Sequence, residues 1–132
     1  MKFVHKSGIR KSSIARATAM KGSGIIRING ILLENYTPQV AQMKIKEPLL
    51  LAGKEADSVD IKINVKGGGY MSQAEAVRLA IGRALADFSK SKKLRETFLE
   101  YDRQLIVADV RRKEMYKPND SKARAKRQKS YR

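Results

Sequence analysis

Three consecutive glycines, Gly67-Gly68-Gly69, are the first candidates for chemistry in this chain. Glycine-rich loops before helices cradle phosphates in nucleotide-binding proteins, because their backbone amides can approach the anion closely. A P-loop also requires Lys followed by Ser or Thr, and a dinucleotide fingerprint requires a different glycine spacing; the chain has neither. We interpret the triple glycine as a strand-to-helix turn with close backbone approach, whose amides can also contact an RNA phosphate.

Residues suited to catalysis or metal binding are scarce. His5 is the only histidine and there is no cysteine, so neither a His/Cys metal cluster nor a serine triad is expected. Glu96 and Glu100 lie one helical turn apart and could be paired carboxylates for acid–base chemistry. Lys92 and Arg103 flank them, however, which is typical of a solvated, charged helix face. The sequence therefore predicts no enzyme, no metal site and no cofactor.

Positive charge is the strongest functional signal. The 132 residues carry 29 Lys and Arg against 13 Asp and Glu, for a net charge of +16. Residues 1–21 hold six basic and no acidic residues, residues 22–110 hold 13 and 11, and residues 111–132 hold ten and two. A charge this large opposes compaction unless a polyanion neutralises it, and nucleic acid is the usual polyanion. A nearly balanced body between basic ends indicates a globular unit with a nucleic-acid-binding arm.

Compartment signals point to the cell interior. The absence of cysteine fits a reducing environment. The N-terminus lacks the apolar run of a signal peptide, and no stretch approaches the length of a membrane span. We predict a soluble, cytoplasmic protein without a membrane partner.

Strand patterns dominate the first half of the chain. Residues 8–20 are predicted to form a strand with one small-residue face, joined by a turn to a second strand over residues 25–33 as a hairpin. We predict a bulge at Asn29-Gly30 within that second strand. Residues 59–65 alternate strictly between apolar and polar side chains, which predicts a half-buried strand. A last strand is predicted over residues 105–108.

A first helix is expected from Thr37-Pro38, since Thr can cap the first turn and Pro is tolerated there. We expect it to direct Val40 and Met43 inward and to be interrupted near Pro48.

A second helix follows the glycines, opened by a capping box of Ser72 and Glu75, and a third spans residues 92–101. The order of these elements predicts an α+β two-layer sandwich: a mixed four-stranded sheet with helices on one face.

The chain is predicted to divide into a globular RNA-binding domain, residues 1–110, and an extended basic C-terminal tail, residues 111–132. Residues 122–132 contain no aliphatic side chain larger than Ala. Such a segment buries too little apolar surface to offset its ordering entropy, so it should order only on a partner.

Candidate RNA contacts are the basic residues of both ends and the glycine turn. Arg27 on the second strand adds to the same signal. Arg can fork onto phosphate, and Tyr can stack on an exposed base. The predicted RNA-binding residues are Arg10, Lys11, Arg16, Gly67, Gly68, Gly69, Arg111, Arg112, Lys113, Lys117, Lys122, Arg124, Lys126 and Arg127.

Three segments together resemble one family, the small-subunit ribosomal protein S9 family. Residues 8–17, GIRKSSIARA, are similar to its N-terminal segment. Residues 67–73, GGGYMSQ, continued through residues 76–85, resemble its signature. Residues 123–132, ARAKRQKSYR, are similar to the tail of its archaeal and eukaryotic branch.

The resemblance implies a fold like the second domain of ribosomal protein S5, with a left-handed βαβ crossover, against the general preference for right-handed ones. It also implies binding to ribosomal RNA in the head of the small subunit, beside neighbouring head proteins, and a tail that reaches the P-site tRNA. Carried over by position, the tRNA-proximal residues are Lys129, Ser130, Tyr131 and Arg132. The bacterial branch ends in Lys-Arg, so the contact made by Tyr131 must differ. Arg127 stands where relatives often have an aromatic residue.

Two other functions fit parts of the sequence. A ribonuclease P protein subunit would require an Arg-rich motif on the crossover helix, and the helix after Gly69 offers only Arg78 and Arg83. A membrane-surface protein with an electrostatic anchor would require apolar residues within the tail, where only Tyr116 and Tyr131 qualify.

Overall fold

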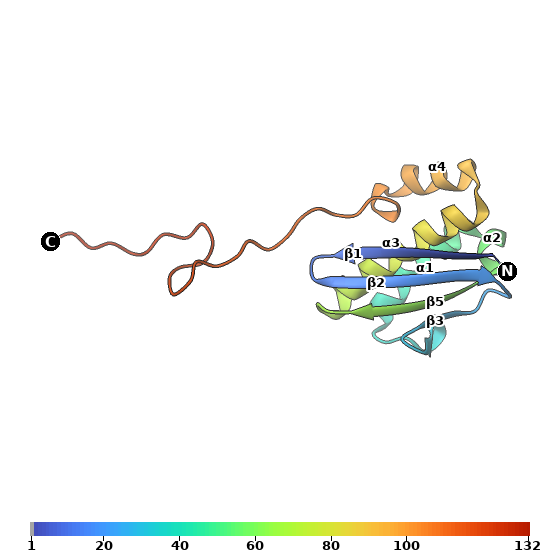
Figure 1. The fold of residues 1–132 in the computed structure, drawn as a ribbon, viewed down its shortest axis with the longest axis horizontal. Helices are drawn as coiled ribbons and strands as arrows, with labels where there is room; N and C mark the ends of the chain where they lie inside the picture. Colours follow the sequence, from blue (N-terminus) through green and yellow to red (C-terminus); the bar gives the residue numbers. More distant parts are fainter. Residues whose placement is uncertain (1) are drawn as a thin grey trace.

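A mixed β-sheet with helices on one of its faces forms the body of the protein, as the computed structural model shows for residues 2–132 (Figure 1). The strands lie in the order β1-β2-β5-β3-β4. Their bounds are β1 Phe3–Arg10, β2 Ser13–Lys21, β3 Ile26–Ile28, β4 Ile31–Leu32 and β5 Val59–Lys66. The helices are α1 Gln39–Ala52, α2 Lys54–Asp57, α3 Tyr70–Ser89 and α4 Lys92–Tyr101, with short 3-10 turns at Leu33–Asn35 and Arg103–Leu105.

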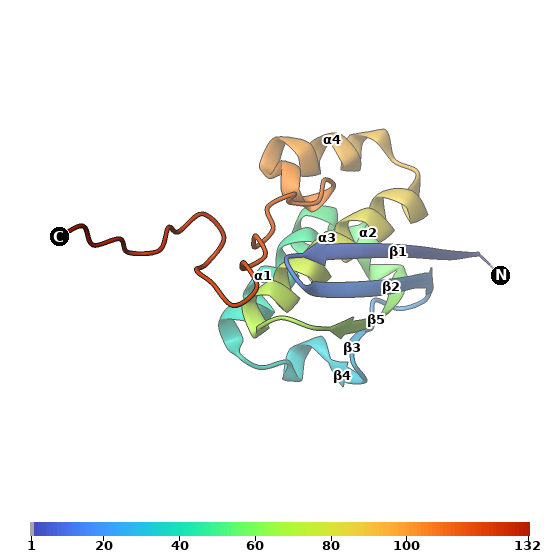
Figure 2. The same cartoon turned by 60° about the vertical axis from the view of Figure 1, so that its left-hand side comes forward.

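The sheet combines antiparallel and parallel pairs. β2 lies between β1 and β5 and is antiparallel to both. β3 runs parallel to β5, with Ile28 opposite Ile63, and carries β4 as a short antiparallel edge. Between β3 and β5 the chain passes through α1 and α2 on the helix-covered face (Figures 1 and 2). The predicted α+β class, the mixed sheet and the single helical face are confirmed.

The predicted count of four strands is wrong, because the sheet has five. Residues 8–20 do not form one strand: β1 and β2 meet at a two-residue turn, where Lys11 has a φ of 52°. Residues 25–33 also divide, since Asn29-Gly30 is a tight turn with φ of 50° and 84°, not a bulge. The expected hairpin between these segments is absent, because β3 pairs with β5.

The predicted strand over residues 105–108 is also wrong. Leu105 ends a 3-10 turn, and it and Ile106 are buried against α3 instead of joining the sheet. Gly82 makes this contact close, since a Cβ there would lie 2.4 Å from the Leu105 carbonyl oxygen.

The first helix presents a different face from the one predicted. Val40 and Met43 are 60% and 61% exposed, whereas the buried positions are Ala41, Ile45, Pro48 and Ala52. Pro48 does not interrupt the helix, which continues to Ala52. The spacing of four, three and four residues keeps the buried side chains on one stripe.

Close packing of α3 on the sheet organises the core. The inward positions of β2 include Ala15, Ala17 and Ala19, each at most 1% exposed, so only methyl groups separate these positions of the strand from the helix. At Gly8 a Cβ would lie 2.2 Å from the Ala76 carbonyl oxygen. α3 is therefore buried on most of its circumference, and even Arg78 is only 8% exposed.

Gly82 provides a test of this packing. Gly82→Ser should destabilise the protein by about 1–3 kcal/mol, because its Cβ would meet backbone that cannot move aside easily. Gly69→Ser is the matched control: no atom lies within 4 Å of a Cβ there, and serine is a good residue at a helix N-cap. Urea unfolding of both variants measures the difference, and equal stabilities would contradict the assigned contact.

Candidate nucleic-acid interface

The triple glycine forms the turn between β5 and α3. Gly67 and Gly68 have φ of 82° and 65°, a region that favours glycine. A Cβ on Gly67 would lie 2.4 Å from the Ser12 carbonyl oxygen, and one on Gly68 would lie 2.2 Å from the Ser13 hydroxyl oxygen. That hydroxyl donates to the Gly67 carbonyl at 2.8 Å. Two glycines thus permit close approach to the β1–β2 turn, as one reading of the sequence predicted.

Gly69 differs from its two neighbours. It has an ordinary φ of −93°, precedes the first turn of α3, and has open space where a Cβ would be. No side chain caps this helix, so the predicted capping box of Ser72 and Glu75 is wrong. The contact of Ser12 and Ser13 with this turn brings two predicted RNA-binding segments, 67–69 and the β1–β2 turn, to one end of the sheet (Figure 1).

Arg10 lies inside the protein rather than on its surface. Its side chain is 13% exposed, its Nε donates to Glu75 at 2.6 Å, and its Nη1 lies 3.2 Å from Asp109. Lys44 reaches the other oxygen of Glu75 at 3.0 Å. Burial raises the pKa of Glu75, but the hydrogen bonds from Arg10 and Lys44 outweigh it, and the pKa lies below its ordinary value.

Asp109 joins the body to the tail. It is 7% exposed and accepts hydrogen bonds from the backbone N–H of Arg111 at 2.9 Å and from its guanidinium at 2.6 Å. These bonds, with the charge of Arg10, hold the pKa of Asp109 well below its usual range. The Arg112 guanidinium donates to the Asp109 carbonyl at 3.0 Å. Predicted RNA contacts Arg10 and Arg111 therefore meet at one buried carboxylate, and Arg112 binds the backbone carbonyl of the same residue.

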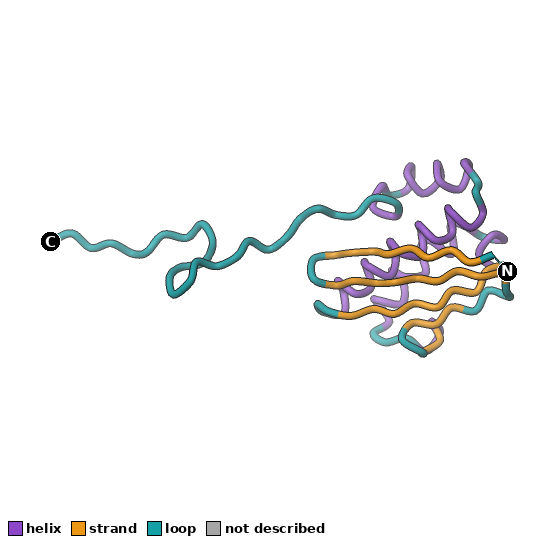
Figure 3. The backbone as a smooth tube through the Cα atoms, viewed as in Figure 1, coloured by secondary structure: helices purple, strands orange, loops and turns teal. Residues whose placement is uncertain are grey.

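Beyond Val110 the chain leaves the body as an extended tail with no helix or strand (Figures 1 and 3). Residues 110–120 are all exposed, as are residues 124–132. Local contacts shape one small loop: Arg124 pairs with Glu114 at 2.7 Å, Arg127 with Asp120 at 2.8 Å, and the Lys117 ammonium donates to the Ala125 carbonyl at 3.2 Å.

The remaining tail side chains make few contacts. Lys113 and Lys122 lie over the Tyr116 ring at 4.7 and 5.9 Å. Tyr131 is 87% exposed. Within the described residues, Lys126, Lys129 and Arg132 have no acidic partner.

The open face of the sheet adds basic residues that were not all predicted. Arg16 projects from β2 and Arg27 from β3, and both are exposed. Lys62 and Lys66 project from β5 to the same face, with Lys62 opposite Arg27 in the strand register. Among the described residues none of these four has an ion-pair partner. The sequence pattern identified the polar positions of β5 as solvent-exposed but did not identify them as a binding surface. The alternation of lysines with buried residues in this strand could have indicated a basic face.

Asp60 lies among these cations but is engaged by the loop before β3. Its carboxylate accepts from the backbone N–H groups of Ile25 and Ser23 at 2.9 and 2.8 Å, and these bonds lower its pKa. The open face is therefore positive in effect, which suits a polyanion.

Other kinds of site find little support in the described chain. Over residues 2–132 no helix is both long and apolar enough to cross a membrane. The described residues also include no group of three or more His, Cys, Asp or Glu side chains arranged to hold a metal ion.

Glu75 tests the ion network at the root of the tail. Glu75→Gln should lower the free energy of unfolding near neutral pH by about 1–3 kcal/mol, because Arg10 loses a charged acceptor in a largely buried setting. Since the folded pKa of Glu75 lies below its ordinary value of 4.5, its contribution is complete above that pH and is lost as the pH falls through the folded value.

The difference between wild type and Glu75→Gln in urea unfolding should therefore shrink on acidification from about pH 7 to about pH 3. Glu96→Gln on the exposed face of α4 is the control and should change stability by less than about 0.5 kcal/mol. A pH-independent difference would contradict the ionic contribution.

Comparison with known proteins identifies the family. The profile of the family described as Ribosomal protein S9/S16 matches residues 8–132. Small ribosomal subunit protein uS9 of Methanococcus maripaludis strain C7 is 52% identical over 134 residues, covering 100% of both chains. The protein of the same name from Methanococcus vannielii is 51% identical, with the same coverage. The chain therefore belongs to the ribosomal protein S9 family and is a structural, non-enzymatic component of the ribosome.

Proposed function

We propose that the protein is a constituent of the small ribosomal subunit that binds ribosomal RNA in the subunit head, within cytoplasmic ribosomes. The observation that carries this proposal is the tail: residues 111–132 hold ten basic and two acidic residues and extend away from the body (Figures 1 and 2). Such a segment gains stability where it neutralises phosphates and releases their counterions. The names of the Methanococcus relatives support a place in the small ribosomal subunit.

In this proposal residues 1–110 are the RNA-binding domain. Lys11 and Arg16 contact phosphates, together with the backbone amides of Gly67, Gly68 and Gly69. Phosphate contacts position the domain, and the fit of its shape to folded RNA supplies specificity. Arg10 contributes indirectly, because Glu75 and Asp109 already engage its guanidinium.

The fold of the domain is proposed to include the left-handed crossover expected of the family. The parallel pairing of β3 with β5, joined through α1 on the helix-covered face, supports that arrangement.

The tail is proposed to follow the RNA backbone between crowded helices. Its contacts at Arg124 and Arg127 are with the tail's own acids, and phosphates can replace both carboxylates on binding. The other proposed contacts come from the exposed cations along the same segment, Arg111, Arg112, Lys113, Lys117, Lys122 and Lys126.

The tip of the tail is proposed to approach the P-site tRNA. Lys129 and Arg132 supply positive charge, and the exposed ring of Tyr131 is free to stack on a base. Neighbouring proteins of the subunit head complete the set of partners.

The geometry disfavours a ribonuclease P subunit. Both arginines of α3, the helix after Gly69, serve the fold: Arg78 pairs with Glu47 and Asp102 at 2.6 and 2.9 Å, and Arg83 donates to two backbone carbonyls. An RNA-processing subunit of that type would present such arginines to its substrate.

The tail's share of RNA binding is measured by truncation. A chain ending at Val110 loses ten basic residues and should lose several units of the log–log salt slope of binding to small-subunit ribosomal RNA, roughly 0.7–0.9 per phosphate contact. The full chain should also prefer that RNA over unrelated RNA of equal length. Equal slopes, or no RNA preference in either protein, would reject the body-and-tail proposal.

The tip is tested separately by deleting residues 129–132. Small subunits reconstituted with this variant should assemble but bind P-site tRNA about tenfold more weakly, since hydrogen bonds between charged groups contribute roughly 1.5–3 kcal/mol. Lys113→Gln/Lys117→Gln removes the same positive charge nearer the body and should leave tRNA affinity close to wild type. Unchanged affinity on deletion would refute the tip contact.

A further inference from the structure

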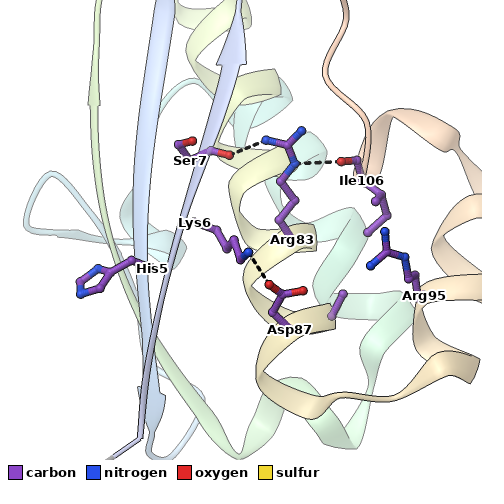
Figure 4. Close-up of a pocket in the computed structure, with 8 residues that line it drawn as sticks. His5, Lys6, Ser7, Arg83, Asp87, Arg95 and Ile106 are labelled. Carbon is purple, nitrogen blue, oxygen red and sulfur yellow. Dashed lines mark hydrogen bonds and ion pairs between the residues drawn. The ribbon is translucent and has the colours of Figure 1, made fainter.

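A basic groove runs beside the free edge of β1, between that strand and the α3–α4 corner. It consists of two adjoining hollows of about 460 and 570 Å³ that share Lys6, Ala86, Asp87 and Arg95 (Figure 4 shows the first). We call it the edge groove. Asp87 is the one acidic residue lining it in the described structure, against six basic ones, Lys2, Lys6, Arg83, Lys90, Lys92 and Arg95.

Most of this positive charge is not neutralised within the protein. Lys6 pairs with Asp87. Lys2 donates to the Phe88 carbonyl at 2.6 Å and lies 4.7 Å over the Phe88 ring, contacts that keep its charge. Over residues 2–132, no acidic side chain pairs with Lys90, Lys92 or Arg95. Figure 4 shows Arg95 on the α4 side of the hollow, facing β1 and Arg83. The groove therefore attracts an anionic partner.

The hydrogen bonds of Arg83 indicate which kind of anionic partner can bind in the edge groove. Its Nη1 donates to the Ser7 carbonyl of β1 at 2.9 Å, and its Nε donates to the Ile106 carbonyl at 2.8 Å (Figure 4). The side chain thus crosses the edge of β1 and occupies a carbonyl that an added strand would need. An acidic peptide could not extend the sheet past Ser7 without breaking this bond. A nucleic-acid strand needs no such ladder, because it is held through its phosphates.

We propose that the edge groove binds the sugar–phosphate backbone of ribosomal RNA, with Arg95 and Lys92 each contacting a phosphate. Arg95 can present its planar fork to two phosphate oxygens, whereas Lys92 acts as a compact charge. The edge groove lies on the body, along β1, whereas β3 lies toward the other edge of the sheet. This proposal rests on the proposed function in ribosomal RNA binding.

The test compares two double variants of the full chain. Lys92→Gln/Arg95→Gln removes two exposed charges from the groove, and Lys54→Gln/Lys93→Gln removes two exposed charges outside it. In binding to small-subunit ribosomal RNA, the groove variant should lower the log–log salt slope by roughly 1.4–1.8, the value for two lost phosphate contacts. The control variant should lower it by less than half as much.

A second measurement locates the RNA directly. Because the chain contains no cysteine, Lys92→Cys carries a single attachment point for an iron chelate that cleaves nearby RNA by hydroxyl radicals. Lys92→Cys should cut a defined segment of small-subunit ribosomal RNA, whereas Lys54→Cys should not cut that segment.

Three outcomes would overturn the groove assignment. If wild type shows no preference for ribosomal RNA over unrelated RNA, the proposed function fails and the groove assignment fails with it. If wild type keeps that preference but both double variants share one salt slope, only the groove assignment fails. If poly-glutamate binds wild type but not the groove variant, while RNA binding is unchanged, the groove serves an acidic protein segment.

Discussion

The close approach of α3 to the sheet is the contact on which the other features depend. Alanines on the inner face of β2 and the missing side chain of Gly8 let the helix lie almost against the strand backbones. A helix packed this closely makes many dispersion contacts per residue, and few of its side chains remain free to move. Its first turn is then held beside the β1–β2 turn, and Gly82 receives the segment that leads into the tail.

The ion pairs follow from the same packing. A helix buried on most of its circumference buries Arg78 and partly buries Glu75, and buried charges require partners. Glu47 and Asp102 pair with Arg78, and Asp109 lies beside Arg10, so these three acids are engaged by cations of the body. Among the described residues, the four cations of the open sheet face and three tail cations, Lys126, Lys129 and Arg132, then have no ion-pair partner. The strongly positive exterior thus results from where the acids are placed as well as from the excess of Lys and Arg.

Local patterns predicted part of this structure well. The alternation of residues 59–65 identified β5, and the helix over residues 92–101 was predicted with its observed bounds, because burial and exposure repeat there with a clear period. The tail's character was visible in its composition, although its contacts stay predictions.

The failures occurred where tertiary contacts choose between local options. Nothing in Lys11-Ser12 indicates a tight turn, which the packing of Ser12 on Gly67 stabilises. Val40 and Met43 look like core residues until α3 selects the neighbouring stripe of α1. The apolar run at residues 105–108 is equally compatible with a strand and with a turn packed on the core. The edge groove combines Lys2 with Arg95, which only the topology brings together.

The junction at Asp109 has a mechanical consequence. Arg10 holds this carboxylate from β1, and Arg83 ties the neighbouring Ile106 carbonyl to the Ser7 carbonyl of the same strand. Tension applied along the tail would therefore load several bonds on β1 and α3 simultaneously, in shear, instead of peeling α4 away turn by turn. A ribonucleoprotein whose parts rotate against each other could transmit force through such an anchor without unravelling the domain that holds it.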